Sequence, residues 1–234
     1  MLCIMLATAA ASPGFGQAEL PGVEAGGEDT SYVRLLLLFA SVAIAPALLA
    51  VLTSFARIIV VLLFLRAGIG SHEIPPTYVL IGLAILLTVV SMLSTLQPIY
   101  EDAVLPLLGE EQSLADGVDA AQGPLRVFMA RQVRPADVEL MASLTDSEPV
   151  SAIEAPMVIL APAFAISELR LAFLIGFVIF LPFVIIDLVV ASTLASIGML
   201  SLPAPALSLP FKILLFVMVD GWALLTEALI STVV

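Results

Sequence analysis

The sequence predicts an all-α membrane protein with two long helical hairpins separated by a small soluble helical block, assembling into a helical ring. Composition is the first observation, because 61% of the 234 residues are hydrophobic, 12% are charged and the mean hydropathy is +1.17. Soluble domains contain roughly 45 to 50% apolar residues. The second observation is that long apolar runs carry isolated charges, which bilayer depth tolerates only beside protein or water. The chain is therefore expected to be one subunit of a membrane assembly.

Residues 1–18 are predicted to be a signal peptide, because an apolar stretch ends in small residues just before Glu19. The stretch lacks the usual basic n-region. Residues 19–31 follow as a flexible acidic segment. The one cysteine, Cys3, lies inside the predicted signal peptide. Cleavage would therefore leave a mature protein without thiol chemistry or disulfides.

Residues 32–100 are predicted to form the first helical hairpin. The apolar run from Tyr32 to Ala67 is longer than the roughly 20 residues of one span, and it contains Pro46. One bent helix or a broken pair of helices is expected there. A polar break with two adjacent prolines leads into a second apolar helix from about Tyr78 to Leu96.

Residues 101–166 are predicted to form an extracytoplasmic soluble helical block, since most of the acids lie between Glu101 and Glu168. An amphipathic pattern interrupted by Pro135 predicts two short helices. Turns are expected at Gly117 and at Gly123-Pro124.

Residues 167–234 are predicted to form the second helical hairpin. Its first helix is expected from about Glu168 to Gly198, and its second from Phe211 to about Ile230, with a proline-rich link between them. Placing the N-terminus outside puts this link and Arg66 on the cytoplasmic side, with a weak cationic bias of the expected sign.

Four charged residues inside the apolar runs are predicted to form a buried charge set: Arg57, Asp187, Lys212 and Asp220. Lys212 is expected to pair with Asp187 or Asp220, within one subunit or across two, because removing one partner of a buried pair strands the other charge. The alternative is that Lys212 extends to the membrane interface. Arg57 is expected to pair with Glu168 or with carbonyl groups across subunits, or else to mark the cytoplasmic limit of the first span.

Two acids in separate membrane helices also raise an intramembrane aspartyl protease or a proton-conducting subunit. A protease needs two carboxylates that share a proton, and neither Asp187 nor Asp220 has the glycine-bracketed pattern of such enzymes. A proton pathway stays open, although the inverted repeat of many transporters is missing. His72 is the only histidine and no catalytic motif occurs, so no enzyme, metal or cofactor is predicted. A net charge of -12 argues against nucleic-acid binding.

Several segments carry a family resemblance: TSFARIIVVLLFLR (53–66), PPTYVLIGLAILLT (75–88), VFMARQVRPAD (127–137), SELRLAFLIGFVIFLPFVIIDLVVASTLASIGM and SLPFKILLFVMVDGW. Together they closely resemble the FliP family of flagellar type III secretion export-gate subunits, whose injectisome counterpart is SctR. The resemblance covers roughly residues 32 to 226.

The resemblance implies a homopentamer that joins FliQ and FliR in a helical, pore-forming export gate for unfolded flagellar proteins. It implies FlhB and the basal-body ring as further partners, and a place in the bacterial inner membrane within the flagellar basal body. It also implies that helices apolar enough to span the bilayer are raised out of it in the assembled gate. The alternative is an assembly scaffold with no transport role of its own.

The resemblance also implies positions for functional residues. The methionine-rich pore gasket of the family falls on Met199, Leu200 and Ser201. Consecutive methionines suit a flexible, water-excluding constriction, and only Met199 remains here, which weakens the match. Channel or subunit contacts fall on Phe128, Met141 and Glu168, with Met141 standing where an aromatic residue is usual.

Overall fold

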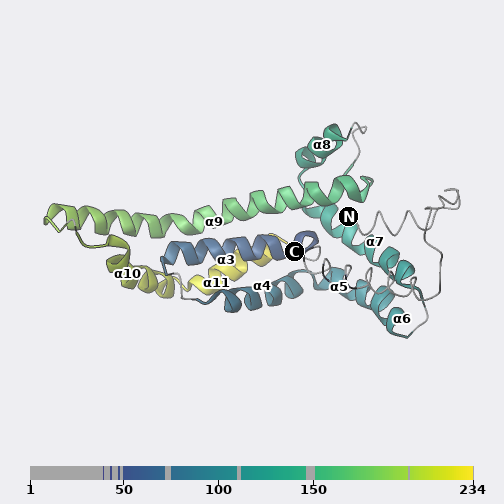
Figure 1. Cartoon of the computed structure of the whole chain (residues 1–234), viewed down its shortest axis with the longest axis horizontal. Coiled ribbons are helices and arrows are strands. Elements are labelled where there is room, and N and C mark those ends of the chain that lie inside the picture. The colour runs from purple at the N-terminus through teal and green to yellow at the C-terminus, as the bar shows by residue number, and fades with distance from the viewer. Residues whose placement is uncertain are drawn as a thin grey trace, which may run out of the picture.

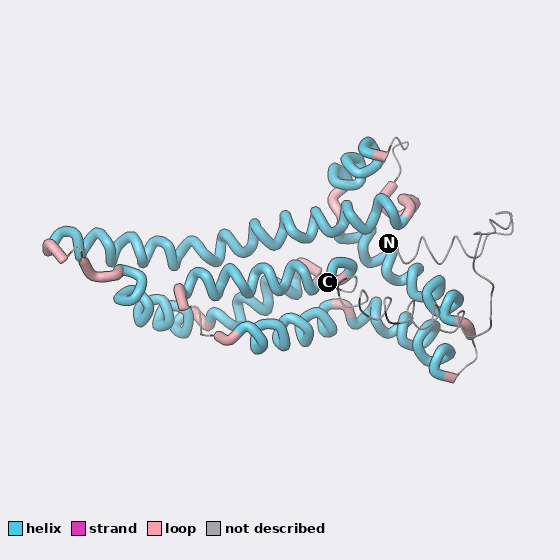
Figure 2. The backbone as a smooth tube through the Cα atoms, viewed as in Figure 1, coloured by secondary structure: helices cyan, strands magenta, loops and turns pink. Residues whose placement is uncertain are grey.

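The computed structural model describes residues 50–71, 75–109, 112–145, 151–199 and 201–233, together with residues 39, 43 and 47. The predicted signal peptide (1–18) and acidic segment (19–31) lie outside the described residues. Every regular element in the described part of the chain is a helix, as Figure 2 shows. The predicted all-α class is confirmed, while the assembly of hairpins into a ring stays a prediction.

The described helices follow one another in this order: α3 (Phe55–Ile69), α4 (Thr77–Ser91), α5 (Leu93–Ile99), the π-helix η1 (Tyr100–Val104), α6 (Leu105–Leu108), α7 (Leu114–Gln132), α8 (Pro135–Leu144), α9 (Met157–Ser196), α10 (Ala204–Met218) and α11 (Gly221–Ser231). The fold is elongated, with α9 running along most of its length and α6 and α7 extending beyond the start of α9 (Figure 1). Helices α3, α4, α10 and α11 lie along the distal part of α9, and α5 to α8 gather at its first part.

Helix α9 is 40 residues long and begins at Met157, earlier than the predicted start near Glu168. Pro156 precedes it with extended backbone, which a proline favours at a helix start. The helix runs through Glu168 without a break, because the Arg57 side chain neutralises the charge of Glu168 inside the fold. The boundary drawn at residue 166 therefore falls within a continuous helix.

The structure contains the two helices predicted on either side of Pro135, since α7 ends at Gln132 and α8 begins at the proline. The turns predicted at Gly117 and Gly123-Pro124 were wrong, because all three residues lie inside α7. A capping box fixes the start of that helix: the Ser113 hydroxyl accepts from the Asp116 N–H, and the Asp116 carboxylate accepts from the Ser113 N–H.

The segment predicted as the last helix of the second hairpin forms two helices rather than one. Helices α10 and α11 meet at a bend of 63°. Asp220 adopts the left-handed conformation at this bend, with φ of 51°. Gly221 follows it with no room for a side chain, because a Cβ there would collide with the Phe216 ring. This break in the helix lies inside an apolar run of residues, so hydropathy alone predicts one continuous helix.

The described residues pack around two hydrophobic cores. The first joins α3, α4, α9 and α11, with Leu62, Leu80 and Leu229 fully buried. The second joins α7, α8 and the first part of α9, with Met129 and Phe164 fully buried. Helix α9 contributes to both cores, which makes it the element that connects the two ends of the molecule.

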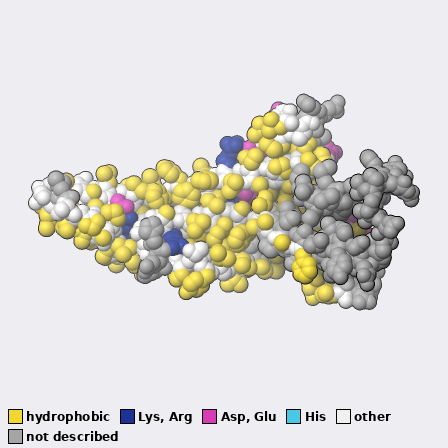
Figure 3. Space-filling view, viewed as in Figure 1, with side chains coloured by type: hydrophobic (Ala, Val, Ile, Leu, Met, Phe, Trp, Pro, Cys, Tyr) yellow, Lys and Arg dark blue, Asp and Glu magenta, His cyan; other side chains and the backbone are white. Residues whose placement is uncertain are grey.

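Within the described residues, α9 alone is long and apolar enough by itself to cross a membrane. Two bent pairs also qualify if each pair is one span: α4 with the segment Leu93–Leu108, bent by 78°, and α10 with α11. Most of the apolar stretch of α9 is exposed, and hydrophobic side chains cover much of the face seen in Figure 3.

Candidate functional site

The most completely buried charges are Arg57 on α3 and Glu168 on α9, which form an ion pair. Their side chains are 0% and 1% exposed. The Arg57 Nε donates to Glu168 Oε2 over 2.7 Å, and the Arg57 Nη2 donates to Glu168 Oε1. This two-point contact is the geometry that a guanidinium and a carboxylate prefer. The structure thus pairs Arg57 with Glu168, one of the partners considered for it from the sequence. Both residues belong to the same chain.

The remaining Arg57 donors reach two other elements. Nη1 donates to the carbonyl oxygen of Thr232 over 2.9 Å and to its hydroxyl over 3.0 Å, just beyond α11. Nη2 also donates to Gln132 Oε1 on α7 over 3.0 Å, and Gln132 Nε2 donates to the carbonyl of Val233 over 2.8 Å. We call Arg57, Glu168, Gln132, Thr232 and Val233 the arginine hub.

The arginine hub satisfies Arg57 within one chain, so the intersubunit contact considered for it is not needed to neutralise its charge. Both partners considered for it, an acid and a carbonyl group, are present, and both belong to the same chain. The physical reason is location, because Arg57 lies between the two cores, where α3, α7, α9 and the end of α11 converge. All five guanidinium N–H groups are used there, so no donor is left for another subunit.

The second predicted charge pair lies toward the far end of α9. Lys212 Nζ on α10 donates to Asp187 Oδ2 over 2.7 Å, and Ser208 Oγ donates to Asp187 Oδ1 over 2.5 Å. Lys212 and Ser208 are buried, whereas the Asp187 side chain is 35% exposed. Of the two acids considered for Lys212, the structure selects Asp187.

Asp220 does not belong to a buried charge set in the chain. It is exposed, and among the described residues no hydrogen bond or ion pair engages its carboxylate. The bend between α10 and α11 carries the side chain to the surface. Any partner of Asp220 would have to come from outside the described part of the chain.

A third polar cluster was not anticipated from the sequence. Asp137 on α8 is buried and accepts from Ser167 Oγ over 2.7 Å and from Arg170 Nη2 over 3.1 Å, both on α9. The backbone N–H of Arg134 donates to Ser167 Oγ over 3.0 Å, which ties the start of α8 to α9. The available signal was an acid in the first turn after Pro135, a position where a carboxylate stabilises a helix.

Helices α3 and α9 approach closely between the two charge pairs. A Cβ on Gly176 would lie 2.5 Å from the Phe64 ring, and a Cβ on Gly68 would lie 2.6 Å from the Phe183 ring. Each helix thus receives an aromatic ring from the other at a glycine. This packing keeps α9 parallel to α3 from the arginine hub to the Lys212 pair.

The predicted gasket lies at the tip of the molecule, beyond the end of α9 (Figure 1). Met199 and Ser201 are exposed there, and Leu200 lies outside the described residues. Gly198 takes the left-handed conformation with φ of 76°, and the Met199 N–H donates to the Leu194 carbonyl over 2.9 Å. The chain therefore turns sharply at this point and presents Met199 at the tip.

The three residues expected at channel or subunit contacts lie away from the tip, on α7, α8 and the first part of α9. Phe128 on α7 is buried and packs edge-on against Phe164, with ring centroids 5.7 Å apart. Met141 on α8 is half-buried against the same core. Glu168 is enclosed in the arginine hub. In the single chain these three residues support the fold around α7, α8 and α9, and their role between subunits stays a prediction.

In the described part of the chain, no three His, Cys, Asp or Glu side chains come together as a metal site. The three polar clusters share one chemistry: a carboxylate on one helix accepts from a cation on another. Such clusters fix helix positions in an apolar setting, where unpaired polar groups are costly.

The FliP family model matches residues 38–229. The chain is 45% identical over 204 residues to the flagellar biosynthetic protein FliP of Bacillus subtilis (strain 168), covering 87% of this chain and 92% of that protein. It is 44% identical over 201 residues to the protein of the same name from Caulobacter vibrioides, covering 86% and 76% of the two chains. The match from Treponema pallidum is 41% identical over 200 residues, covering 84% and 74%. The chain therefore belongs to the FliP family.

Proposed function

We propose that this protein is a pore-forming subunit of the flagellar type III export gate, required for basal-body assembly and for export of unfolded flagellar proteins. In this role it forms a homo-oligomer, a pentamer by family resemblance, in the inner membrane within the flagellar basal body. FliQ, FliR, FlhB and the basal-body ring are its proposed partners. Membership of the FliP family supports this proposal.

One observation carries the proposal beyond family membership: after Glu168, one face of α9 is apolar and uncovered. Large side chains stand out from it, with Leu174 65% exposed and Val178 65% exposed. A single folded chain rarely leaves such a surface bare, because large exposed apolar patches mark protein or membrane contacts. Lipid or neighbouring subunits must therefore cover this part of α9.

The fixed direction of α9 supports a ring assembly. The arginine hub holds its first part, and the Lys212–Asp187 pair holds its distal part to α10. A helix anchored at two levels presents the same apolar face in every copy. When this face of each copy meets a different face of the next copy, the repeated head-to-tail contact closes into a ring if the rotation is right.

We further propose that Met199 and the residues after it form the constriction of the pore. The tip of each subunit then contributes one exposed Met199 side chain. A ring of such side chains excludes water while remaining deformable. Ser201 adds a polar edge, so the seal depends mainly on Met199 and its apolar neighbours.

The test is complementation of a flagellated bacterium that lacks its own FliP. The wild-type gene should restore secretion of flagellar proteins into the medium and a high-molecular-weight complex on native gels. A Met199→Gly variant should retain the complex and leak small ions when the complex is reconstituted in vesicles. A complex that restores basal bodies but shows no leak with Met199→Gly favours the scaffold alternative.

A further inference from the structure

The exposed cations in the described part of the chain gather at one place. Among the lysine and arginine side chains described, Arg57 and Lys212 are buried, and Arg66 and Arg126 are half-buried. The exposed ones lie where α7, α8 and α9 meet, and they are Arg131, Arg134 and Arg170. Figure 3 shows cationic side chains at the junction of α8 with α9. We call these three residues the arginine collar.

The arginine collar is built around a buried acid. Asp137 accepts from Arg170 Nη2 over 3.1 Å and from Ser167 Oγ over 2.7 Å. Ser167 Oγ in turn accepts from the Arg134 N–H over 3.0 Å, so Arg134 and Arg170 lie beside the same acid. The Asp137 side chain is 3% exposed, whereas the Arg170 side chain is 56% exposed. No hydrogen bond or ion pair engages the side chains of Arg131 and Arg134 among the described residues. The collar therefore keeps free donors that face outward from the protein.

The arginine collar lies at the start of an uncovered apolar stripe on α9. Arg170 shares one face of the helix with large apolar side chains that recur three or four residues apart. Each is between 40% and 66% exposed, and they are Phe173, Leu174, Phe177, Leu181, Val184 and Leu188. Ala172, Gly176 and Phe183 lie on the opposite face and are buried. The stripe ends at Ser192, whose exposed side chain donates to the Leu188 carbonyl. From Arg170 to Ser192 the helix rises by about 33 Å, close to the roughly 30 Å of hydrocarbon in a bilayer.

We propose that the arginine collar binds the headgroup of an anionic phospholipid whose acyl chains lie along the stripe. The proposal rests on the proposed function only for the membrane setting, and it concerns the chain while α9 lies in a bilayer. A ligand that contacts both the collar and the stripe must be anionic at one end and apolar along its length. Phosphate oxygens match the N–H fork of a guanidinium, and cations at the membrane surface attract anionic lipids. The net charge of -12 opposes that attraction, so a preference for an anionic lipid has to come from the local arginines.

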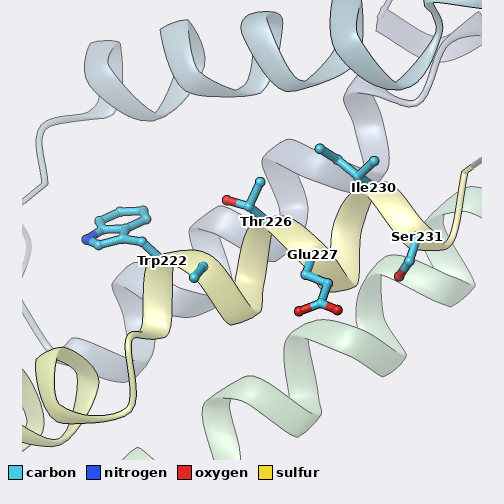
Figure 4. Close-up of a pocket in the computed structure, with 6 residues that line it drawn as sticks. Trp222, Thr226, Glu227, Ile230 and Ser231 are labelled. Carbon is cyan, nitrogen blue, oxygen red and sulfur yellow. The ribbon is translucent and has the colours of Figure 1, made fainter.

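A second copy of the chain matches the collar and the stripe less well. Glu139 on α8 and Glu227 on α11, which Figure 4 shows, are exposed acids on different helices, so each would neutralise one guanidinium of the three. Helices α8 and α11 have 10 and 11 residues, which is too short to cover the stripe. Asp220 follows Phe216, whose ring centroid lies 6.5 Å from that of Phe183, so this acid lies near the far part of the stripe and away from the collar. Lipid headgroups, in contrast, surround α9 wherever the hydrocarbon ends.

The test is native mass spectrometry of the full-length protein in detergent, with equal amounts of phosphatidylglycerol and phosphatidylcholine that carry the same acyl chains. The wild type should retain about ten times more phosphatidylglycerol, as expected for several cations beside one headgroup. Arg134→Gln with Arg170→Gln should bring the ratio of the two lipids to within about twofold of one. Arg134→Gln alone should lower the ratio about threefold. Arg126→Gln removes the same charge and should keep the wild-type ratio, because Arg126 lies outside the collar and donates to the Ala155 carbonyl.

Equal retention of the two lipids by the wild type, or a preference that survives the double variant, would overturn the proposal. Leu174→Gln with Phe177→Gln changes only the stripe, so it should weaken both lipids by a similar factor and keep their ratio. Unchanged retention of both lipids would show that the stripe holds no acyl chain. Excess inorganic phosphate should leave phosphatidylglycerol bound. Its displacement would assign the collar to a free anion, and either of these last two results would overturn the proposal.

The same spectra count the copies in each complex. A changed copy number in the Arg134→Gln, Arg170→Gln variant, with the lipid ratio of the wild type, would identify a second copy as the occupant and overturn the proposal. If loss of Arg170 lowers the yield of folded protein, Arg131→Gln with Arg134→Gln replaces that variant, because neither side chain has a partner in the described part of the chain. The ratio should then fall at least threefold, and an unchanged ratio would overturn the proposal. None of these measurements reports on export, so failure of this inference is distinct from failure of the proposed function.

Discussion

The two ion pairs that hold α9 differ in how completely the protein encloses them. In the Arg57–Glu168 pair both side chains are buried, and every guanidinium N–H has an acceptor. In the Lys212–Asp187 pair the cation is buried, while the Asp187 side chain is 35% exposed. A charge fully removed from water needs all of its hydrogen bonds, whereas a partly hydrated carboxylate can lose its partner at lower cost. The Arg57–Glu168 pair is therefore a fixed joint between helices, in the sense that separating its charges is costly. The Lys212–Asp187 pair can separate at lower cost.

The largest expected effect comes from breaking the fixed joint. Arg57→Ala leaves Glu168 buried without a cation and also frees the Thr232 carbonyl, so it should destabilise the protein by about 3 to 5 kcal/mol. In detergent, the Tm should fall by roughly 10 °C. The double variant Arg57→Met with Glu168→Met should recover much of this loss. A Tm for Arg57→Ala equal to that of the wild type would contradict the proposed role of the hub.

A smaller effect is expected between the two pairs, where α3 and α9 pack at glycines. Gly176→Leu places a side chain against the Phe64 ring and should cost about 2 to 3 kcal/mol by forcing the helices apart. Gly82→Leu on α4 is the matched control, because a Cβ at Gly82 meets nothing within 4 Å. The Tm of the two variants separates the outcomes, and equal values would show that the close approach does not constrain α9.

The Lys212–Asp187 pair should respond asymmetrically. Asp187→Asn leaves the buried Lys212 ammonium without its anion and should cost about 1 to 2 kcal/mol, whereas Lys212→Met leaves a carboxylate that water reaches and should cost less than about 1 kcal/mol. Chemical denaturation of both variants in one detergent compares them directly. Asp220→Asn serves as the control and should be neutral. A larger loss for Lys212→Met than for Asp187→Asn would reverse the comparison drawn above.

A still smaller effect is expected at the third cluster. The Arg170 side chain is 56% exposed although its partner Asp137 is buried. Arg170→Gln should therefore change stability by less than about 1 kcal/mol, as exposed ion pairs usually do. Ser167→Ala, which removes a buried hydroxyl between Asp137 and Arg134, should cost more than Arg170→Gln in the same denaturation experiment.

The smallest effect is a pH dependence at the start of α7. Hydrogen bonds from Ser113 lower the pKa of Asp116 from its ordinary value of 3.8. Because the folded pKa is the lower one, the carboxylate contributes its stability above the unfolded value, and the contribution is lost as the pH falls through the folded pKa. Amide exchange at the first turn of α7 should accelerate in that range in the wild type and not in Asp116→Asn. The same acceleration in both proteins would exclude Asp116 as its source.

The sequence predicted the helical class, the break at Pro135 and the need for charge pairs, because each depends on local chemistry or on the cost of a buried charge. The sequence could not predict that Lys212 pairs with Asp187 rather than with Asp220. That pairing depends on a 63° bend at one left-handed residue in an apolar run. The helix through Gly117 and Pro124 was also missed. The helix capped at Ser113 continues through these positions despite the turn preference of their residues.

The arginine hub was only half predictable for a different reason. Arg57 and Glu168 are recognisable as charges in apolar segments. The remaining acceptors are the Thr232 hydroxyl, the backbone carbonyls of Thr232 and Val233, and an amide on Gln132. Backbone acceptors have no signature in a sequence, because every residue has one. Pairs of charges can thus be inferred from residue types, whereas the groups that complete their shells require the fold.

The hub also has a consequence for synthesis. Arg57 lies 111 residues before Glu168 and 175 residues before Thr232. At translation speeds of about 5 to 20 residues per second, several seconds or more pass between the synthesis of Arg57 and that of its acceptor Thr232. During that interval the early helices cannot settle into an apolar environment with a satisfied guanidinium. Biogenesis of this protein should therefore depend on a factor or an aqueous environment that keeps the Arg57 guanidinium solvated until Thr232 has been synthesised.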